Sequence, residues 1–185
     1  MKNMIFILSF LTYITNAFAE NPTKSIISLE YHTGEIAQTF GNASAGDNRD
    51  VTKYGIKIGA VADIKRLFLS YRYASIENTL VDTTGYSFSI EYEGMATENG
   101  SGLFAGFIAG YGNYDFVGND ETTRTQSGFF YGMDFGIALV MAESYGIDFG
   151  LRYTLPVDTK NEDVASEVYK INDTTTSYIS LNYLY

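Results

Sequence analysis

The chain has 185 residues, with 22 acidic and 12 basic side chains and a formal net charge of −10 at pH 7. This charge argues against nucleic-acid binding, because phosphate backbones need basic partners. The absence of cysteine excludes disulfide bonds, a thiolate metal site and a cysteine-linked lipid anchor. Glycine, tyrosine and phenylalanine are abundant and long helical periodicity is missing, so an all-β fold is expected.

Residues 1–19 are predicted to form a cleavable secretory signal peptide. Lys2 supplies a single positive charge, residues 5–14 are predominantly apolar, and Ala17 and Ala19 give a small-x-small cleavage pattern. A transmembrane helix is the alternative, but the apolar stretch is shorter than the ~20 residues that span a bilayer. Residues 20–185 are therefore expected to form one domain.

The rest of the chain divides into eight segments in which apolar and polar side chains alternate. Within 129–139, for example, Phe129 and Phe135 share one face, whereas Gly132 and Asp134 share the other. This alternation is typical of half-buried β-strands. The expected strands are 27–36, 53–62, 67–73, 86–93, 103–114, 129–139, 145–155 and 178–185.

The segment 103–114 has the least regular alternation of the eight. Its apolar face is expected to contain Leu103, Phe107 and Tyr111, opposite a second row that is rich in glycine. This choice sets the register that we predict for the fifth strand.

The last predicted strand, Tyr178–Tyr185, runs to the end of the chain. A free strand edge with an apolar face tends to aggregate, so this strand is expected to pair with the first and close a barrel. Alternating hydrophobic residues that end in an aromatic residue resemble the closing strand of bacterial outer-membrane β-barrels. The resemblance implies a C-terminal assembly signal that consists of Tyr183 and Tyr185. One face of the strand is wholly apolar or aromatic and consists of Ile179, Leu181, Tyr183 and Tyr185.

The expected connections alternate between short turns and longer polar loops. This alternation is typical of outer-membrane barrels, whose long loops are extracellular. An even number of strands places both termini on the periplasmic side. Short turns are expected at 63–65, 97–102 and 141–144, a medium loop at 76–84, and long loops at 37–50, 116–127 and 156–175.

A secreted, lipocalin-type barrel with a ligand inside is the soluble alternative. The polar rows argue against it, since they contain small residues such as Gly55, Ser89 and Gly132, where a solvated face would favour larger side chains. Small residues suit the narrow interior of an eight-stranded barrel. The apolar rows carry no charge and have tyrosines near their ends, as a lipid-facing belt would. We therefore expect an eight-stranded, antiparallel, up-and-down transmembrane β-barrel.

In this orientation, four basic and five acidic side chains face the barrel interior. Since they nearly balance, we expect them to pair across the lumen as a charge network. The alternative is an ion path through a narrow, porin-like channel. Side chains normally fill so narrow a lumen, which argues against that alternative. The predicted network consists of Glu30, Lys53, Lys57, Arg72, Glu91, Glu93, Asp134, Asp148 and Arg152.

The four connections expected at the outer end, which are the medium loop and the three long loops, carry most of the net negative charge. We expect this charge to keep the exposed end soluble, with attraction of divalent cations or basic partners as the alternative. The sequence assigns no metal site and no cofactor-binding residue.

The only histidine, His32, shares a strand face with Ser28 and Glu30. These residue types could form a catalytic triad, and some outer-membrane enzymes that modify lipid A are eight-stranded barrels. Same-face neighbours stand about 6.5 to 7 Å apart, beyond hydrogen-bond reach. The chain also lacks the His-x-Ser pair of the lipid A deacylases, since Thr33 and Gly34 follow His32. A hydrogen-bonded interior histidine and no catalytic residue are expected, with a lipid A-modifying enzyme as the second alternative.

Residues 20–185 as a whole resemble the small outer-membrane barrels, such as the OmpA membrane domain, OmpX and the opacity-like surface antigens. The resemblance implies a surface protein with a structural or adhesive role through acidic extracellular loops and no catalysis. Its expected partners are outer-membrane lipid and lipopolysaccharide, the barrel assembly machinery through the C-terminal strand, and an unidentified surface receptor. No periplasmic domain is expected after the closing strand.

Overall fold

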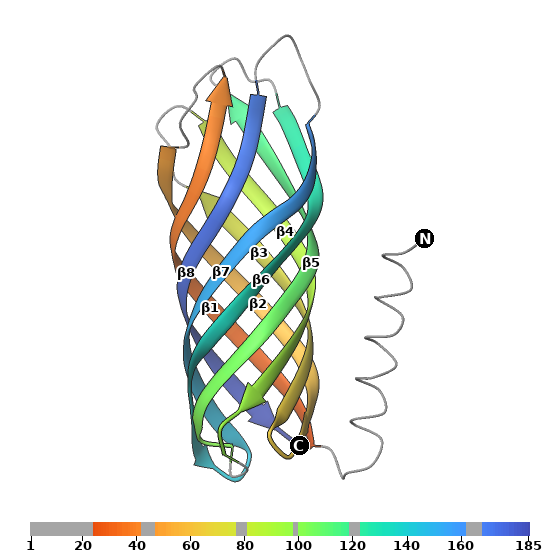
Figure 1. Cartoon of the computed structure of the whole chain (residues 1–185). Helices are drawn as coiled ribbons and strands as arrows, with labels where there is room; N and C mark the ends of the chain where they lie inside the picture. The colour runs from red at the N-terminus through yellow and green to blue at the C-terminus, as the bar shows by residue number, and fades with distance from the viewer. Residues whose placement is uncertain (1–23, 42–46, 77–80, 98–99, 119–122, 162–167) are drawn as a thin grey trace, which may run out of the picture.

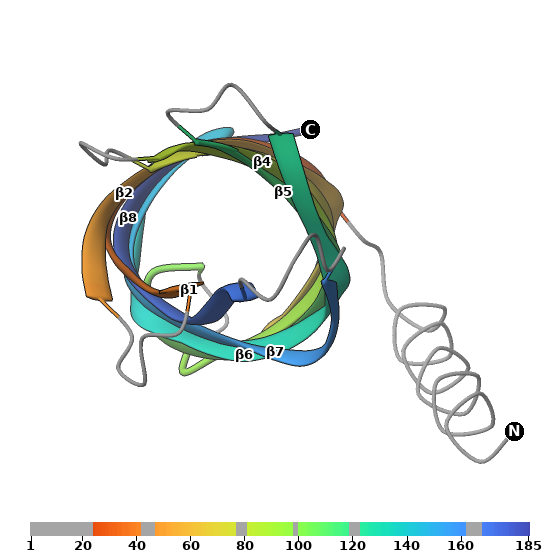
Figure 2. The ribbon, with the colours of Figure 1, turned by 90° about the horizontal axis from the view of Figure 1, so that it is seen from above.

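The computed structural model describes residues 24–41, 47–76, 81–97, 100–118, 123–161 and 168–185, and these form a closed β-barrel (Figures 1 and 2). The eight strands follow one another around the barrel in chain order and each is antiparallel to its neighbours, which confirms the predicted fold. None of the described residues forms a helix with the length and apolar character needed to cross a bilayer. The strands are β1 (Lys24–Gly41), β2 (Asp47–Ala62), β3 (Lys65–Ile76), β4 (Val81–Met95), β5 (Gly102–Gly118), β6 (Thr123–Ala142), β7 (Tyr145–Asn161) and β8 (Val168–Leu184).

The barrel closes where the last strand meets the first, as predicted. Leu181 of β8 lies opposite Leu29 of β1, and the pairing continues along both strands. Near the termini, the backbone N–H of Ser25 donates to the carbonyl oxygen of Tyr185 at 2.9 Å, and the N–H of Tyr185 donates to that of Ser25 at 3.0 Å. The chain therefore ends as a fully paired strand. The predicted signal peptide, residues 1–19, lies outside the described residues and stays a prediction.

Two connections at the end that holds the C-terminus are tight, as predicted (Figure 1). Asp63 and Ile64 join β2 to β3, and Glu143 and Ser144 join β6 to β7. Asp63 has a φ of 50°, in the left-handed region that aspartate tolerates and that two-residue hairpins require. We call this end of the barrel the turn end and the opposite end the far end.

Apolar side chains face outward along the part of each strand nearest the turn end. Phe135 of β6 is 57% exposed, whereas the adjacent Asp134 is 1% exposed and points inward. On β5, Leu103 and Phe107 are exposed and Phe104 is buried, which confirms the register predicted for that strand. Since all eight strands contribute exposed apolar residues, an apolar belt encircles the barrel.

A row of tyrosines marks the edge of the belt that faces the far end. Tyr31, Tyr54, Tyr73 and Tyr86 lie opposite one another on the consecutive strands β1 to β4. The rings of Tyr31 and Tyr54 have centroids 5.5 Å apart. Aromatic rows of this kind occupy the interface between hydrocarbon and water in membrane barrels.

Beyond this row the polarity of the strands reverses. Outward positions now carry polar side chains such as Thr33, Glu35 and Asp82, all exposed. Inward positions carry apolar residues, which pack together as a buried cluster. The far end thus has the polarity of a water-soluble barrel, with a polar surface and an apolar core. This far-end cluster consists of Ile36, Val51, Ala74, Ile76, Phe116 and Ile171, with Tyr114 packed against it.

The prediction of three long loops is wrong for most of their length, because the strands continue through much of 37–50, 116–127 and 156–175. The shorter loop predicted at 76–84 is also partly strand. The reason is the reversal of polarity, which places polar residues on the outward row and makes an extended strand resemble a loop in composition. Residues 42–46, 77–80, 119–122 and 162–167 lie outside the described part of the chain.

Candidate functional site

The candidate site is the barrel interior, where the structure places all nine charged residues of the predicted network. Each is at most 9% exposed. Eight of the nine join Arg66 in one continuous chain of ion pairs in which acidic and basic side chains alternate, whereas Lys53 stands apart. In order, the chain is Asp148, Arg66, Glu93, Lys57, Glu30, Arg72, Glu91, Arg152 and Asp134.

The half of the ion-pair chain nearer the turn end is built around Arg66 of β3. Its Nη1 lies 2.9 Å from Oδ2 of Asp148, and its Nη2 lies 2.5 Å from Oε2 of Glu93. The Nζ atom of Lys57 continues the chain, 3.4 Å from Oε1 of Glu93 and 3.2 Å from Oε1 of Glu30. Five strands, β1 to β4 and β7, are joined by these contacts, so the pairs cross-link the barrel wall.

The other half is organised by Arg72 and Arg152, which share carboxylates. Nη2 of Arg72 lies 2.6 Å from Glu30 and 2.5 Å from Glu91. Nη2 of Arg152 lies 2.8 Å from Glu91 and 2.9 Å from Asp134. Burying these charges singly would be very costly, and the alternation offsets that cost because each internal member has opposite charges on both sides.

Hydroxyl groups complete the network around Glu91. Ser70 donates to Oε1 of Glu91 at 2.6 Å, and Ser89 donates to the same oxygen at 3.2 Å. Tyr178 of β8 donates to Asp134 at 3.4 Å. These partners occupy lone pairs that the ion pairs leave open, which a buried polar network requires.

Arg66 was missed in the sequence-based prediction. It falls between the expected turn 63–65 and the first residue assigned to the third strand, Leu67. The alternation could have indicated that Arg66 faces inward, since Arg66 has the same parity as the inward-facing Phe68, Ser70 and Arg72. Starting the strand one residue earlier would have made the interior set five basic and five acidic residues.

His32 lies within this network rather than in a catalytic triad. Its Nε2 atom is 3.3 Å from Oε2 of Glu30, so the expectation that same-face neighbours cannot reach one another is wrong for this pair. The two side chains converge because the interior is narrow. Nδ1 lies 3.4 Å from the hydroxyl of Thr176, and the ring stacks on Tyr178. The buried Ser28 hydroxyl has no hydrogen-bond partner among the described residues, so it does not complete a triad with them.

Three buried carboxylates, Glu91, Glu93 and Asp134, have oxygen atoms within 4.8 Å of one another. Such a group could hold a cation. Here each carboxylate already has a guanidinium or ammonium partner, from Arg66, Arg152 or their neighbours in the chain. The positive charge of these partners occupies the place that a metal ion would take, so the group fits ion pairing better than metal binding.

Apolar layers lie on both sides of the ion pairs. Toward the turn end, Met95, Phe104 and Ala138 pack with Tyr178. Toward the far end stands the cluster around Phe116, which is 0% exposed. There the first residues of β8, which precede Thr174, pair with β1 but not with β7, and they lie inside the outline of the barrel (Figure 2). The amide of Ile171 donates to Oε1 of Gln126 at 2.7 Å, which ties β8 to β6. Side chains therefore fill much of the lumen.

The two residues of the predicted assembly signal, Tyr183 and Tyr185, lie on the outer surface at the turn end. They are 44% and 65% exposed, and their rings are stacked with centroids 5.9 Å apart. Tyr145 of β7 packs against Tyr183 at 5.3 Å. The three rings form an aromatic group at the border of the apolar belt.

A closed eight-stranded barrel with an apolar exterior and a charge-filled interior is the arrangement of β-barrels that span membranes. No protein-family model matches the chain, and no curated protein matches it. Solved structures do match. The crystal structure of Neisserial surface protein A is 9% identical with a TM-score of 0.63, and covers 89% of this chain and 98% of its own.

A second match is the outer membrane protein OprG from Pseudomonas aeruginosa. It is 12% identical with a TM-score of 0.59, and the alignment covers 89% of this chain and 97% of that one. At these identities the likeness concerns the fold. The chain has the fold of the small eight-stranded outer-membrane barrels, which confirms the predicted resemblance.

Proposed function

We propose that this chain is an outer-membrane surface protein whose filled barrel anchors a polar far end outside the cell. This proposal rests on the reversal of polarity along the strands. A transmembrane β-strand needs about 9 to 11 residues, whereas the strands here contain 12 to 20. The excess lies beyond the tyrosine row, where the outward side chains become polar.

The proposed orientation rests on the same geometry. Outer-membrane barrels place their short turns and their termini in the periplasm. The two-residue turns at Asp63–Ile64 and Glu143–Ser144, together with Tyr185, would then face the periplasm, and the strand extensions would face the outside. Tyr183 and Tyr185 would be presented to the barrel assembly machinery at the inner border of the apolar belt.

The working surface would be the outward face of the strand extensions together with the connections between them. This face carries exposed carboxylates, including Glu35, Asp50 and Asp82. A rigid barrel that projects an acidic surface suits a structural or adhesive role, with basic groups on the partner. This surface replaces the long loops that the sequence alone suggested as the site of contact.

The contents of the lumen support neither alternative. A porin-like path would need a water-filled lumen, whereas two apolar layers and the ion-pair chain occupy this one. A lipid A-modifying enzyme would need a reactive group that reaches lipid, but His32 is 0% exposed and lies inside the barrel. We infer that the protein has no catalytic role.

Labelling of single cysteines tests the topology, because the chain contains no cysteine of its own. In intact cells, Thr84→Cys is expected to react with a membrane-impermeant maleimide. Glu143→Cys is expected to react only after the outer membrane is permeabilised. Phe135→Cys, on the lipid-facing surface, is expected to remain unlabelled both in intact and in permeabilised cells. Labelling of Glu143→Cys but not Thr84→Cys in intact cells would show that the barrel has the opposite orientation to the one proposed.

A binding assay on intact cells tests the role. A triple variant, Glu35→Gln, Asp50→Asn and Asp82→Asn, is expected to lose adhesion while its barrel folds normally. A His32→Ala variant serves as the control and is analysed for altered lipid A. Unchanged adhesion in the triple variant would count against contact through this surface, and a lipid A change that depends on His32 would favour an enzyme.

A further inference from the structure

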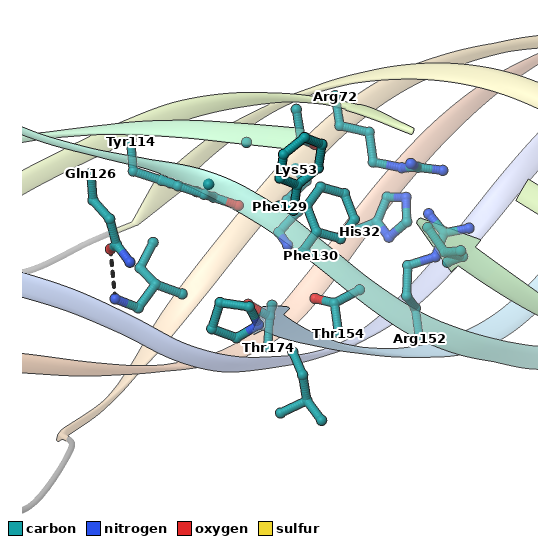
Figure 3. Close-up of a pocket in the computed structure, with 17 residues that line it drawn as sticks. His32, Lys53, Arg72, Tyr114, Gln126, Phe129, Phe130, Arg152, Thr154 and Thr174 are labelled. Carbon is teal, nitrogen blue, oxygen red and sulfur yellow. Dashed lines mark hydrogen bonds between the residues drawn. The ribbon is translucent and has the colours of Figure 1, made fainter. Parts of the chain in front are cut away.

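A cavity of about 60 Å³ lies inside the barrel between the ion-pair chain and the far-end apolar cluster (Figure 3). His32, Arg72 and Arg152 gather at one side of it, and Tyr114 and Gln126 stand at the other. A buried water needs roughly 10 to 15 Å³ of such space. The cavity therefore has room for a small ion with part of its hydration shell.

The lining of this cavity is one-sided in charge. It includes Lys53, Arg72 and Arg152, but no aspartate or glutamate among the described residues. The carboxylates that pair with the two arginines lie in the ion-pair chain and do not line the cavity. Positive groups with no negative group among them favour an anion.

Lys53 is the residue that distinguishes the cavity from the rest of the interior. It is 9% exposed, and no described carboxylate forms an ion pair with it, unlike Lys57 and Arg66. In Figure 3 its side chain lies between the two groups of labelled residues that flank the cavity. A buried ammonium without a counter-ion is costly, and an anion beside it would offset that cost.

Neutral hydrogen-bond donors complete the lining. Ser87, Thr154 and Thr174 bring hydroxyl groups, and Gln126 brings an amide. Hydroxyl and N–H donors around a positive side chain form the kind of environment that an anion requires once it has left water.

We propose that this cavity binds one small monovalent inorganic anion, with chloride as the ion that fits its size and its single unpaired ammonium group. The bound ion would pair with the Lys53 ammonium group, which lies outside the ion-pair chain, and would fix the side chains between the ion pairs and the apolar cluster. This inference is independent of what the outer surface contacts, since it concerns only the lumen.

The test uses the purified full-length barrel, folded in detergent and crystallised with sodium bromide, whose anion scatters anomalously. An anomalous peak within contact distance of the Lys53 ammonium is expected in the parent protein. It is expected to disappear in Lys53→Met, which keeps an unbranched side chain but removes the ammonium group, and to persist in Lys65→Met at the turn end. No peak in the parent protein at saturating bromide would overturn the proposal, because Lys53 would then be neutral or hydrated.

A solution measurement covers the case in which Lys53→Met does not fold. Exchange of chloride with a protein site broadens the ³⁵Cl NMR line, so the parent protein should show excess broadening. Added bromide should displace the bound chloride and remove this broadening. Lys53→Gln should lose this broadening and Lys65→Met should keep it. Equal broadening in parent and Lys53→Gln would contradict a site at Lys53, as would its absence from the parent.

Discussion

The ring of Tyr178 lies directly over Gly150 inside the barrel. A Cβ atom on Gly150 would come within 2.5 Å of the Cε1 and Cζ atoms of that ring. The two residues are cross-strand neighbours on β7 and β8. Tyr178 also stacks on His32 at 4.9 Å and lies 4.9 Å from the guanidinium carbon of Arg152. A residue without a side chain at position 150 thus lets an aromatic ring fill the lumen beside the ion pairs.

Gly150→Ala is expected to lower the free energy of unfolding by about 1 to 3 kcal/mol, because the added methyl group overpacks the space under the Tyr178 ring. Urea-induced unfolding in lipid vesicles, followed by circular dichroism, measures the change. Gly94→Ala is the matched control, since its Cβ would meet only the carbonyl oxygen of Ala105 at 3.9 Å. Equal losses in both variants would contradict this packing.

Phe135→Arg tests the apolar belt. A charged side chain on the lipid face near the middle of the belt is expected to destabilise the barrel by about 2 to 4 kcal/mol. Thr84→Arg lies on the outward row beyond the tyrosines and should change stability by less than about 1 kcal/mol. The same unfolding assay compares the two, and similar values for both would place the membrane boundary elsewhere. The inward Gly136 is a poor control, because a Cβ there would press on the carbonyl oxygen of Phe149.

Glu91→Gln tests the ion-pair chain at its centre. The substitution removes the negative charge that Arg72 and Arg152 share, and leaves these two buried guanidinium groups partly unpaired. Breaking a buried pair in this way is expected to cost about 3 to 5 kcal/mol. Asp82→Asn, at an exposed position, should have little effect. The midpoint of urea unfolding measures both, and a stable Glu91→Gln variant would show that the chain contributes little.

Electrical recordings test whether the lumen is closed. In planar bilayers the protein is expected to show no reproducible single-channel steps, because the ion pairs and two apolar layers fill the barrel. Phe116→Ala should weaken the far-end cluster without producing steps, since the ion-pair chain remains in place beneath it. Stable steps in the parent protein that change in Glu91→Gln would instead identify a conducting path.

Tyr185→Ala tests the predicted assembly signal. The Tyr185 ring is exposed and stacks only at the surface, so the substitution should leave folding of the purified protein into vesicles nearly unchanged. In cells, the amount of folded protein in the outer membrane should fall. Comparing in vitro folding yield with membrane fractions separates the two effects. A loss in vitro that equals the loss in cells would indicate a structural role for the ring.

The architecture could be predicted from the sequence because a strand has a period of two. Phe135 and Asp134 are adjacent in the chain and lie on opposite sides of the wall, which the alternation alone indicates. The same pattern predicted closure through Tyr178–Tyr185, the tight turn after Ala62 and the inward direction of nine charged residues. These properties depend only on neighbours along the chain and on the requirement that a strand edge be paired.

The extent of the strands was harder to predict because the outward row changes from apolar to polar side chains part-way along the strands. Around Ile36 and Val51 the apolar residues turn inward, and polar residues such as Glu35 and Asp50 take the outward row. A strand with a polar outer face has the composition of a loop. Only the paired backbone of β1 and β2 shows that this region is still part of the barrel.

The ion partners were decided by the tertiary structure alone. Arg152 and Glu91 are 61 residues apart in the chain, and Arg66 and Asp148 are 82 apart. They meet because closure of the barrel brings distant strands across a lumen that is too narrow to hold their side chains apart. The sequence by itself determined which side chains enter the lumen, since that depends on parity. Which charges pair, and that Lys53 stands beside a cavity with no described carboxylate to pair with it, depended on the closed three-dimensional packing.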